Sequence, residues 1–387
     1  MRAAIALAAG FLVLLVGGGA RFAIGLTFKP IVDEFDWARG ELGLAVGLYM
    51  VVSAFATFLA GRLADRLSPR ALLTAGTILG GIGIALMGLI SQPWHALLLY
   101  GVVFAIGNGA ASLVIVGVIV MRAFPGRAGL ANAVAISGMS VGQLLMMAIL
   151  APVMVQVGWR WVFIWIGVAH LVLLPLLLGL PGRQAAPLAG EAPREGLSLR
   201  EAARKRQFWV LLTIYAICGL DDFFVTTHVV ALAQDSGLDA LFSGHLLALM
   251  GLTALAGVIA AGIESDRVGP VRPAAAVFAA RVLVFGWIAF DQSVLSITIF
   301  ALVFGSTFLV TAPLTVVFVR ESFGTRNLGA LAGLITMVHQ IFGGLGAYAG
   351  AVIHDATGAY DFAFVVMLVS AVIALGLTLL LGRPRGA

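Results

Sequence analysis

The stretch GRLADRLSPR at positions 61–70 places an Asp-Arg pair four residues after a glycine, between two apolar runs. A related stretch, GIESDRVGPVR, returns at positions 262–272, about half a chain length later. The Asp-Arg pair again begins four residues after the glycine. A charged turn that recurs at half-chain spacing between apolar runs indicates an internally duplicated membrane protein.

The composition points the same way. Of the 387 residues, 61% are hydrophobic and only 11% are charged. In a typical soluble domain, about a quarter of the residues are charged. The 48 glycines suit helices that pack closely in a bilayer. We therefore expect an all-α membrane protein whose apolar surface faces lipid.

Apolar runs of about 20 residues are long enough to cross a bilayer as helices. By this criterion we predict twelve transmembrane helices in two pseudo-symmetric six-helix bundles. The long polar segment 181–206 divides an N-terminal bundle, 1–180, from a C-terminal bundle, 207–387, and we expect it to be a cytoplasmic linker. The expected spans are 3–27, 40–61, 71–92, 95–121, 128–154, 158–180, 207–233, 242–263, 272–290, 293–319, 327–352 and 360–382.

The positions of the basic residues predict the orientation. If both termini are cytoplasmic, only Lys29, Arg39 and Arg160 fall in outer loops, while Arg21 and Arg281 lie inside spans. Every other Lys and Arg then falls on the cytoplasmic side, as the positive-inside rule requires. Because nearly all of the 23 basic residues are arginine, which is typical of GC-rich genomes, we expect a multi-pass protein of a bacterial plasma (inner) membrane.

Taken together, the twelve spans, the division into six and six, and the G-x-x-x-D-R turn after the second and eighth spans resemble the major facilitator superfamily of secondary transporters. Three stretches resemble a bacterial branch related to monocarboxylate porters: GGGARFAIGLTFKPIVDEFDWARGELGLA at 17–45, GWRWVF at 158–163 and TTHVVALAQDSGL at 226–238. The resemblance implies alternating access to a central cavity. The eukaryotic-type porters carry an Asp-Arg pair inside the eighth helix, but here no charge precedes Glu264 in that span.

The two charged turns supply candidate gating residues. A carboxylate in such a turn can cap a neighbouring helix or pair with an arginine, and the pair would have to break when the cytoplasmic side opens. The alternative is that the arginines only set the topology, which leaves the aspartates without a role. The gating candidates are Asp65, Arg66, Arg70, Asp266, Arg267 and Arg272.

Two arginines inside the spans, Arg21 and Arg281, are candidate substrate-binding residues. An arginine at the centre of a membrane helix costs at least about 2.5–3.5 kcal/mol, so each needs a carboxylate side chain or an anionic substrate as its partner. A structural ion pair is the alternative. It is favoured more for Arg281, because the resemblance places its span at the periphery.

Asp221 and Asp222 are candidate proton carriers, because burial and mutual repulsion favour protonation of one of them. Adjacent helical residues point about 100° apart, so we expect at most one to face a cavity. The alternatives are that they neutralise an arginine or mark a break in the helix.

Five further polar residues complete the predicted substrate site. His228, His339 and Gln340 are able to bind a carboxylate or relay protons, and Asn108 and Gln143 lie on helices that the resemblance turns inward. Each can instead hydrogen-bond a neighbouring helix, and for His228 we favour that structural role.

These residues favour a proton-coupled transporter of a small organic anion, most simply a monocarboxylate. The alternative is a proton-driven efflux pump for amphipathic or cationic compounds, and a third hypothesis is a membrane sensor without transport. The sequence has no Walker loop, no HExxH and a single cysteine, so we expect no enzyme activity, cofactor or metal. The expected partners are the substrate, protons and the lipid bilayer, with no nucleic acid, and we expect a monomer.

Overall fold

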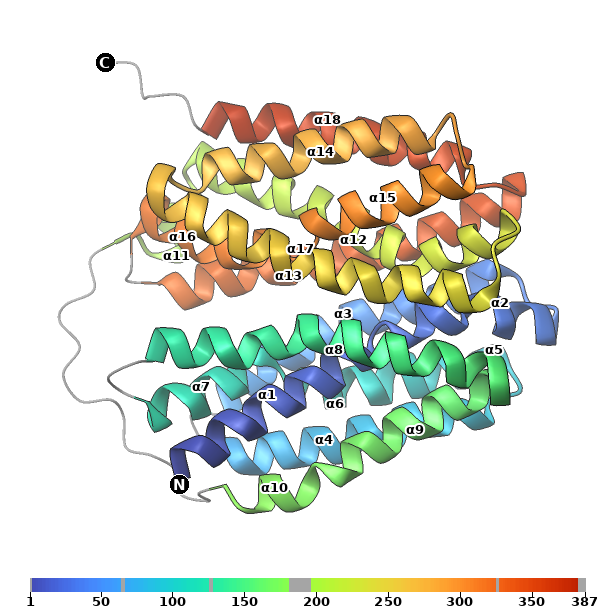
Figure 1. Ribbon diagram of the computed structural model, residues 1–387. Coiled ribbons are helices and arrows are strands. Elements are labelled where there is room, and N and C mark those ends of the chain that lie inside the picture. Colours follow the sequence, from blue (N-terminus) through green and yellow to red (C-terminus); the bar gives the residue numbers. More distant parts are fainter. Residues whose placement is uncertain (1, 64–66, 125–127, 181–195, 325–326, 382–387) are drawn as a thin grey trace. The chain divides into compact units, whose positions relative to one another are not determined.

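The computed structural model describes residues 2–63, 67–124, 128–180, 196–324 and 327–381, and nearly all of this chain is helical (Figure 1). Eleven helices in the described ranges are long and apolar enough to cross a membrane. A further span is divided into two shorter helices, α15 (Val294–Thr307) and α16 (Thr311–Phe323). The expected all-α fold with twelve membrane spans is confirmed.

The helices follow the expected spans, although several spans consist of more than one helix. Those of the first half are α1 (Arg2–Ala20), α2 (Ala23–Phe35), α3 (Arg39–Leu63), α4 (Pro69–Leu86), η1 (Met87–Leu89), α5 (Pro93–Leu98), η2 (Leu99–Phe104), α6 (Ala105–Ala110), α7 (Leu113–Ala123), α8 (Ala128–Val157), α9 (Trp159–Val172) and α10 (Leu174–Leu178). After the short α11 (Leu199–Ala202), the second half contains α12 (Arg206–Asp235), α13 (Ala240–Val268), α14 (Val271–Ile288), α15, α16, α17 (Leu328–Thr357) and α18 (Asp361–Leu381).

Local sequence signals explain where several helices begin and end. The Ser68 hydroxyl accepts a hydrogen bond from the Ala71 amide at 3.1 Å, and Pro69 is the first residue of α4. This is a favourable start for a helix, because the cap accepts a hydrogen bond that the first turn cannot make internally and proline lacks an N–H. α17 ends at Thr357, and the next residue, Gly358, has a φ of 75°, in the left-handed region that glycine adopts readily.

Several spans are broken inside their length, among them the first and the tenth. The first is interrupted at Arg21 and Phe22, between α1 and α2. The tenth is interrupted between α15 and α16, where Leu309 has a φ of 64°. Irregular backbone at membrane depth is tolerated only where it is buried in protein or lines a cavity, and broken helices in transporters border their binding sites. Both breaks therefore indicate where to look for a functional site.

The contacts divide the chain into two compact units. The first unit comprises Met1–Pro187 and Thr226–Gly251, and the second comprises Leu188–Val225 and Leu252–Ala387. The last ten residues of α12 and the first part of α13 thus belong to the first unit. The boundaries proposed from the sequence, 1–180, 181–206 and 207–387, stay a prediction.

Each unit contains a close helix pair that depends on glycine. In the first unit, a Cβ added to Gly142 of α8 would lie 2.0 Å from the Leu15 carbonyl oxygen of α1. In the second, a Cβ on Gly219 of α12 would lie 1.9 Å from the His339 carbonyl oxygen of α17. Glycine permits such close approach of two backbones in a membrane bundle. The two pairs join the first span to the fifth and the seventh to the eleventh, as a duplicated architecture requires.

Candidate functional site

A fully buried charged cluster lies inside the second unit, centred on Arg281 of α14. Its Nη2 donates to Asp222 Oδ1 at 2.5 Å, and its Nη1 lies 3.7 Å from Asp221 Oδ2. The side chain of Arg281 is 0% exposed. The two aspartates that the sequence marked as proton carriers and the arginine that it marked as a substrate ligand therefore form one ion-pair network.

The same guanidinium also contacts the broken tenth span. Its Nε donates to Thr307 Oγ1 at 3.1 Å and its Nη2 to the Thr307 carbonyl at 3.4 Å. Thr307 is the last residue of α15, so Arg281 places positive charge at the negative end of that helix dipole. Burial of this arginine is thus compensated by two carboxylates and a helix terminus.

His339 of α17 connects the cluster to a more accessible position. Its Nε2 lies 3.1 Å from Asp222 Oδ2, and its side chain is 18% exposed, compared with 2% for Asp222. Asp221 receives a separate hydrogen bond from the Ser370 hydroxyl at 2.9 Å. Gln340, the next residue of α17, is partly buried. His339 is thus clearly more exposed than the carboxylate that it contacts.

The charges of this cluster favour the binding of one proton. One guanidinium and two ionised carboxylates would leave a net negative charge buried in an apolar interior, and an uncompensated buried charge is costly. A single proton, on a carboxyl group or on His339, makes the set neutral. Because the groups are in contact, such a proton belongs to the cluster as a whole.

Cys218 adds a thiol to the cluster, and its contacts argue against a metal site. The potential ligand atoms of Cys218, Asp222 and His339 lie within 4.8 Å of one another. However, Arg281 Nη1 already lies 3.6 Å from the Cys218 sulfur, and Nη2 is bonded to Asp222. A metal cation there would be held against a fixed guanidinium, so the donor set does not suit one.

A second polar cluster lies in the first unit at the break between α1 and α2. The Tyr100 hydroxyl donates to the Arg21 carbonyl at 3.0 Å, and Asn108 Nδ2 donates to the Tyr49 hydroxyl at 2.6 Å. The two tyrosine rings have centroids 4.8 Å apart. The Arg21 side chain is partly buried, and its Cζ lies 5.4 Å from the centroid of the Phe22 ring. Arg21 and Asn108 thus share one polar region.

The tyrosines of this region were not among the residues singled out from the sequence. Tyr49 lies on α3 and is 2% exposed, whereas Tyr100 is 0% exposed and lies in the π-helical turn η2. π-helical turns occur frequently at functional sites. The sequence signal for these residues was a tyrosine within an apolar span. A buried phenol requires a hydrogen-bond partner, so such a tyrosine indicates a polar contact inside the bundle.

Two other predicted site residues lie elsewhere in the first unit. Gln143 of α8 is fully buried, and its Nε2 donates to the Leu247 carbonyl of α13 at 3.2 Å. His228 is 2% exposed and meets the edge of the Phe28 ring, with centroids 5.2 Å apart. Both side chains thus make contacts between helices, which was the structural alternative for each.

A third charged cluster, near the end of α12, was not foreseen. Asp235 receives Arg39 Nη2 at 2.6 Å and Lys29 Nζ at 3.0 Å. Lys29 also lies 3.1 Å from Asp33, and the Arg39 side chain is only 7% exposed. We call Lys29, Arg39 and Asp235 the outer cluster. The sequence did contain a signal for this cluster. Lys29 and Arg39 are two of the three basic residues predicted for outer loops, and Asp235 lies at the outer end of the seventh span.

The GWRWVF stretch has a similar pairing role. Glu34 accepts a hydrogen bond from Trp159 Nε1 at 2.7 Å, and its carboxylate lies 2.7 Å from Arg160 Nη2. The Arg160 guanidinium also covers the Trp159 ring at 4.4 Å from the centroid. These contacts tie the end of α2 to the start of α9.

The predicted gating residues are only partly covered by the described chain. Asp65 and Arg66 lie outside the described residues, as does the side chain of Asp266. Arg70 Nη1 donates to the Leu180 carbonyl at 3.0 Å, which joins α4 to the residues that follow α10. Arg267 and Arg272 are exposed. Their role in gating stays a prediction.

The long apolar helices, glycine-mediated helix pairs and buried charges are those of a multi-pass membrane protein. Among solved structures, the chain resembles a bacterial homologue of the human lysosomal transporter Spinster, with a TM-score of 0.82, 17% identity, and coverage of 100% of this chain and 99% of that one. It also resembles the nucleoside transporter NupG, with a TM-score of 0.75, 14% identity and coverage of 99% of both chains. At these identities the likeness concerns the fold.

The model of the Major Facilitator Superfamily matches residues 10–347, with a second match over 211–387. The protein therefore belongs to the major facilitator superfamily. Similar relatives include the uncharacterised MFS-type transporter YcxA of Bacillus subtilis (strain 168), 26% identical and covering 90% of both chains. Another is monocarboxylate transporter 13 of Rattus norvegicus, 25% identical over 94% of this chain and 84% of that protein.

Proposed function

We propose that this protein is a proton-coupled secondary transporter of a small organic anion, most simply a monocarboxylate. The observation that carries the proposal is the hydrogen bond between the partly exposed His339 and the buried Asp222, which is also paired with Arg281. This arrangement places a proton-binding carboxylate inside the bundle, in contact with a partly exposed histidine. Coupling requires such a group, because the proton must be bound and released within the transport cycle.

The cluster at the break of the first span supports binding of an anion. Arg21, the Tyr49 and Tyr100 hydroxyls and the Asn108 amide bring a positive charge and several hydrogen-bonding groups together. A guanidinium pairs well with a carboxylate, since it can donate two parallel hydrogen bonds. The similarity to a protein named monocarboxylate transporter 13 agrees with this substrate class.

Transport by alternating access requires contacts that form in one state and break in another. We assign this role to the outer cluster, in which Asp235 near the end of the seventh span binds Lys29 and Arg39 of the first two spans. On the opposite side, the charged turns with Arg70, Arg267 and Arg272 are proposed to act when the inner side closes. The proposed location is a bacterial plasma membrane with both termini in the cytoplasm.

Transport by purified protein in proteoliposomes tests the proposal. We expect uptake of a radiolabelled monocarboxylate to increase when the outside is made acidic, and to disappear in Arg21→Ala. A His339→Gln variant should lose acceleration by the pH gradient but retain exchange of labelled for unlabelled substrate at equal pH. Exchange requires binding and conformational change but no net proton movement.

A matched control is His228→Gln, which removes a buried histidine of the first unit, outside the charged cluster. It should keep the response to the pH gradient. The proposal fails if no carboxylate is taken up, or if His339→Gln and the parent respond equally to the gradient. Extrusion of cationic compounds by the same vesicles would instead favour the efflux alternative.

A further inference from the structure

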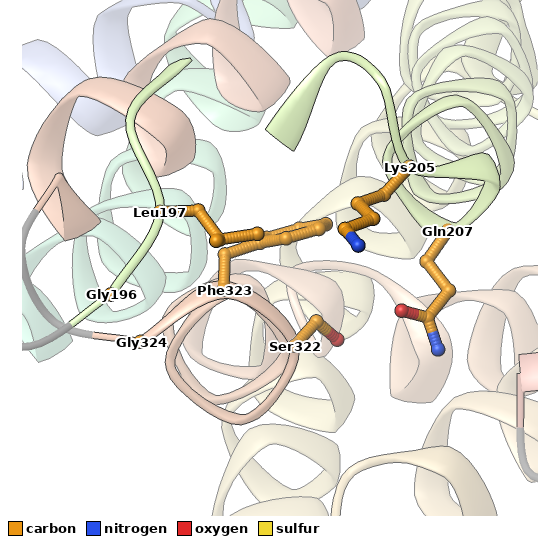
Figure 2. Close-up of a pocket in the computed structure, with 7 residues that line it drawn as sticks. All are labelled: Gly196, Leu197, Lys205, Gln207, Ser322, Phe323 and Gly324. Atoms are coloured by element: carbon orange, nitrogen blue, oxygen red, sulfur yellow. The ribbon is translucent and has the colours of Figure 1, made fainter. Parts of the chain in front are cut away.

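A cavity in the second unit lies apart from the charged cluster, next to the short helix α11. It has a volume of about 420 Å³, within the range of small-ligand pockets. Figure 2 shows Lys205, Gln207 and Ser322 around the same opening, with Leu197 and Phe323 forming an apolar side. A positive charge, an amide and a hydroxyl thus meet beside hydrophobic surface.

The cavity is part of a well-defined local structure. The Leu197 amide donates to the Phe323 carbonyl at 2.9 Å, in an antiparallel bridge between Gly196 and Gly324. Asn327 Nδ2 donates a hydrogen bond to the Leu197 carbonyl at 3.0 Å. The chain before α12 is therefore fixed against the end of α16. The Lys205 amide bonds to the Ala202 carbonyl at 2.8 Å, so the backbone that carries the lysine is also held.

The position of the cavity indicates the polar boundary of the membrane. It lies at the start of the seventh span and the end of the tenth, where an apolar span gives way to charged residues. Trp209, in the first turn of α12, is 57% exposed, and Leu199 on α11 is 44% exposed. Exposed tryptophan at the end of a span is typical of the headgroup region.

The charges around the cavity fit an anion. Arg200, Arg204 and Arg206 are exposed on the same segment as Lys205, and no ion pair of Lys205 is found among the described residues. Two acids are close in sequence to residues around the cavity, Glu201 to Lys205 and Glu321 to Ser322. Glu201 accepts the Ser198 amide at 2.7 Å, and Glu321 is exposed but does not line the cavity. Basic segments beside a membrane span attract anionic headgroups on the cytoplasmic leaflet.

We propose that this cavity binds the phosphate headgroup of an anionic phospholipid, with Lys205, Gln207 and Ser322 contacting the phosphate and Leu197 and Phe323 lying beside the glycerol and acyl region. The inference goes beyond transport of the substrate and does not depend on its identity. A lipid is favoured over a soluble phosphate because the cavity lies at the ends of two membrane spans and has the apolar Leu197 and Phe323 in its lining.

Native mass spectrometry of the full chain in a neutral detergent tests this assignment, with phosphatidylglycerol as the probe and phosphatidylcholine as the zwitterionic comparison. We expect a distinct phosphatidylglycerol adduct that is weakened about five-fold by Lys205→Ala, the effect of about one basic contact with an anionic headgroup. Lys205→Arg should retain the adduct. Arg200→Ala removes the same charge from the same segment outside the cavity, and it should have a much smaller effect.

Three results would overturn the assignment. Equal binding of both lipids would show that the net negative charge of the headgroup is not recognised. An equal effect of Arg200→Ala and Lys205→Ala would show a general surface charge in place of a site. If glycerol 3-phosphate or inorganic phosphate displaces the lipid at similar concentration, the cavity binds soluble phosphate. Substrate uptake by Lys205→Ala, measured separately, distinguishes a failure of this inference from a failure of the proposed transport function.

Discussion

Arg281 Nη2 and Asp222 Oδ1 are 2.5 Å apart, and the two side chains are 0% and 2% exposed. The two residues are separated by 59 positions and come from α14 and α12. A buried pair of this kind contributes little net stability compared with a well-packed apolar pair, but loss of one partner leaves an uncompensated charge. We therefore expect a large loss of stability when only one of the two residues is replaced.

We predict that Arg281→Gln alone destabilises the protein by about 3–5 kcal/mol, because both carboxylates then lose their positive partner. The double variant Arg281→Gln with Asp222→Asn should be less destabilised than this single variant, since it removes opposite charges together. Thermal unfolding in detergent measures the stability of the parent, the single variant and the double variant. A double variant whose losses are simply additive would show that the two residues do not interact.

We predict that Asp235→Asn favours opening on the side of the outer cluster, because Lys29 and Arg39 both lose their carboxylate partner. A cysteine introduced by Thr27→Cys, at a fully buried position of α2, reports the opening through its reaction with a membrane-impermeant maleimide.

The matched control for this experiment is Asp33→Asn. Asp33 also pairs with Lys29, at 3.1 Å, but its side chain is 55% exposed, so its loss should change little. Labelling of the parent without Thr27→Cys corrects for Cys218. Equal labelling in the Asp235→Asn and parent backgrounds would remove the outer cluster from the proposed gate.

Gly142→Ala should prevent normal packing of α1 on α8. The added Cβ would lie 2.0 Å from the Leu15 carbonyl oxygen and 2.9 Å from its Cα, and backbone atoms cannot move aside as a flexible side chain can. We expect a lower melting temperature and little folded protein. Gly376→Ala in α18 is the matched control, because no atom lies within 4 Å of its added Cβ. It should gain about 0.5–1 kcal/mol from helix propensity, and equal losses at both sites would contradict the prediction.

Leu309→Val should destabilise the break between α15 and α16. Leu309 has a φ of 64°, which costs an L-residue about 1–2 kcal/mol, and a β-branched side chain is still less compatible with it. Leu302→Val within α15 makes the same chemical change in regular helix and should cost less. Leu309→Gly removes the strain, so it should be milder than Leu309→Val. Melting temperatures of the three variants give the order, and the reverse order would show that side-chain packing dominates.

The candidate site was predictable in its members but not in its contacts. Asp221 and Asp222 stood out because acids are costly in hydrocarbon, and Arg281 stood out for the same reason. An ion pair between Arg281 and these aspartates was only one of the alternatives, because it depends on which faces of helices distant in sequence come together. The outer cluster was missed for a related reason. Lys29, Arg39 and Asp235 lie at the ends of spans, where charges are common and carry no energetic signal of their own.

The amino-acid sequence by itself determined the membrane class, the twelve spans and the duplicated order of the helices. These depend on the length of apolar runs and on charged turns, which are local along the chain. Only the tertiary structure decided that Arg281, Asp222 and His339 share one network, that Arg21 lies at a helix break beside two tyrosines, and that α15 and α16 divide the tenth span. Such features arise from helix packing, in which a rotation of one helix by a single residue would bring different side chains together.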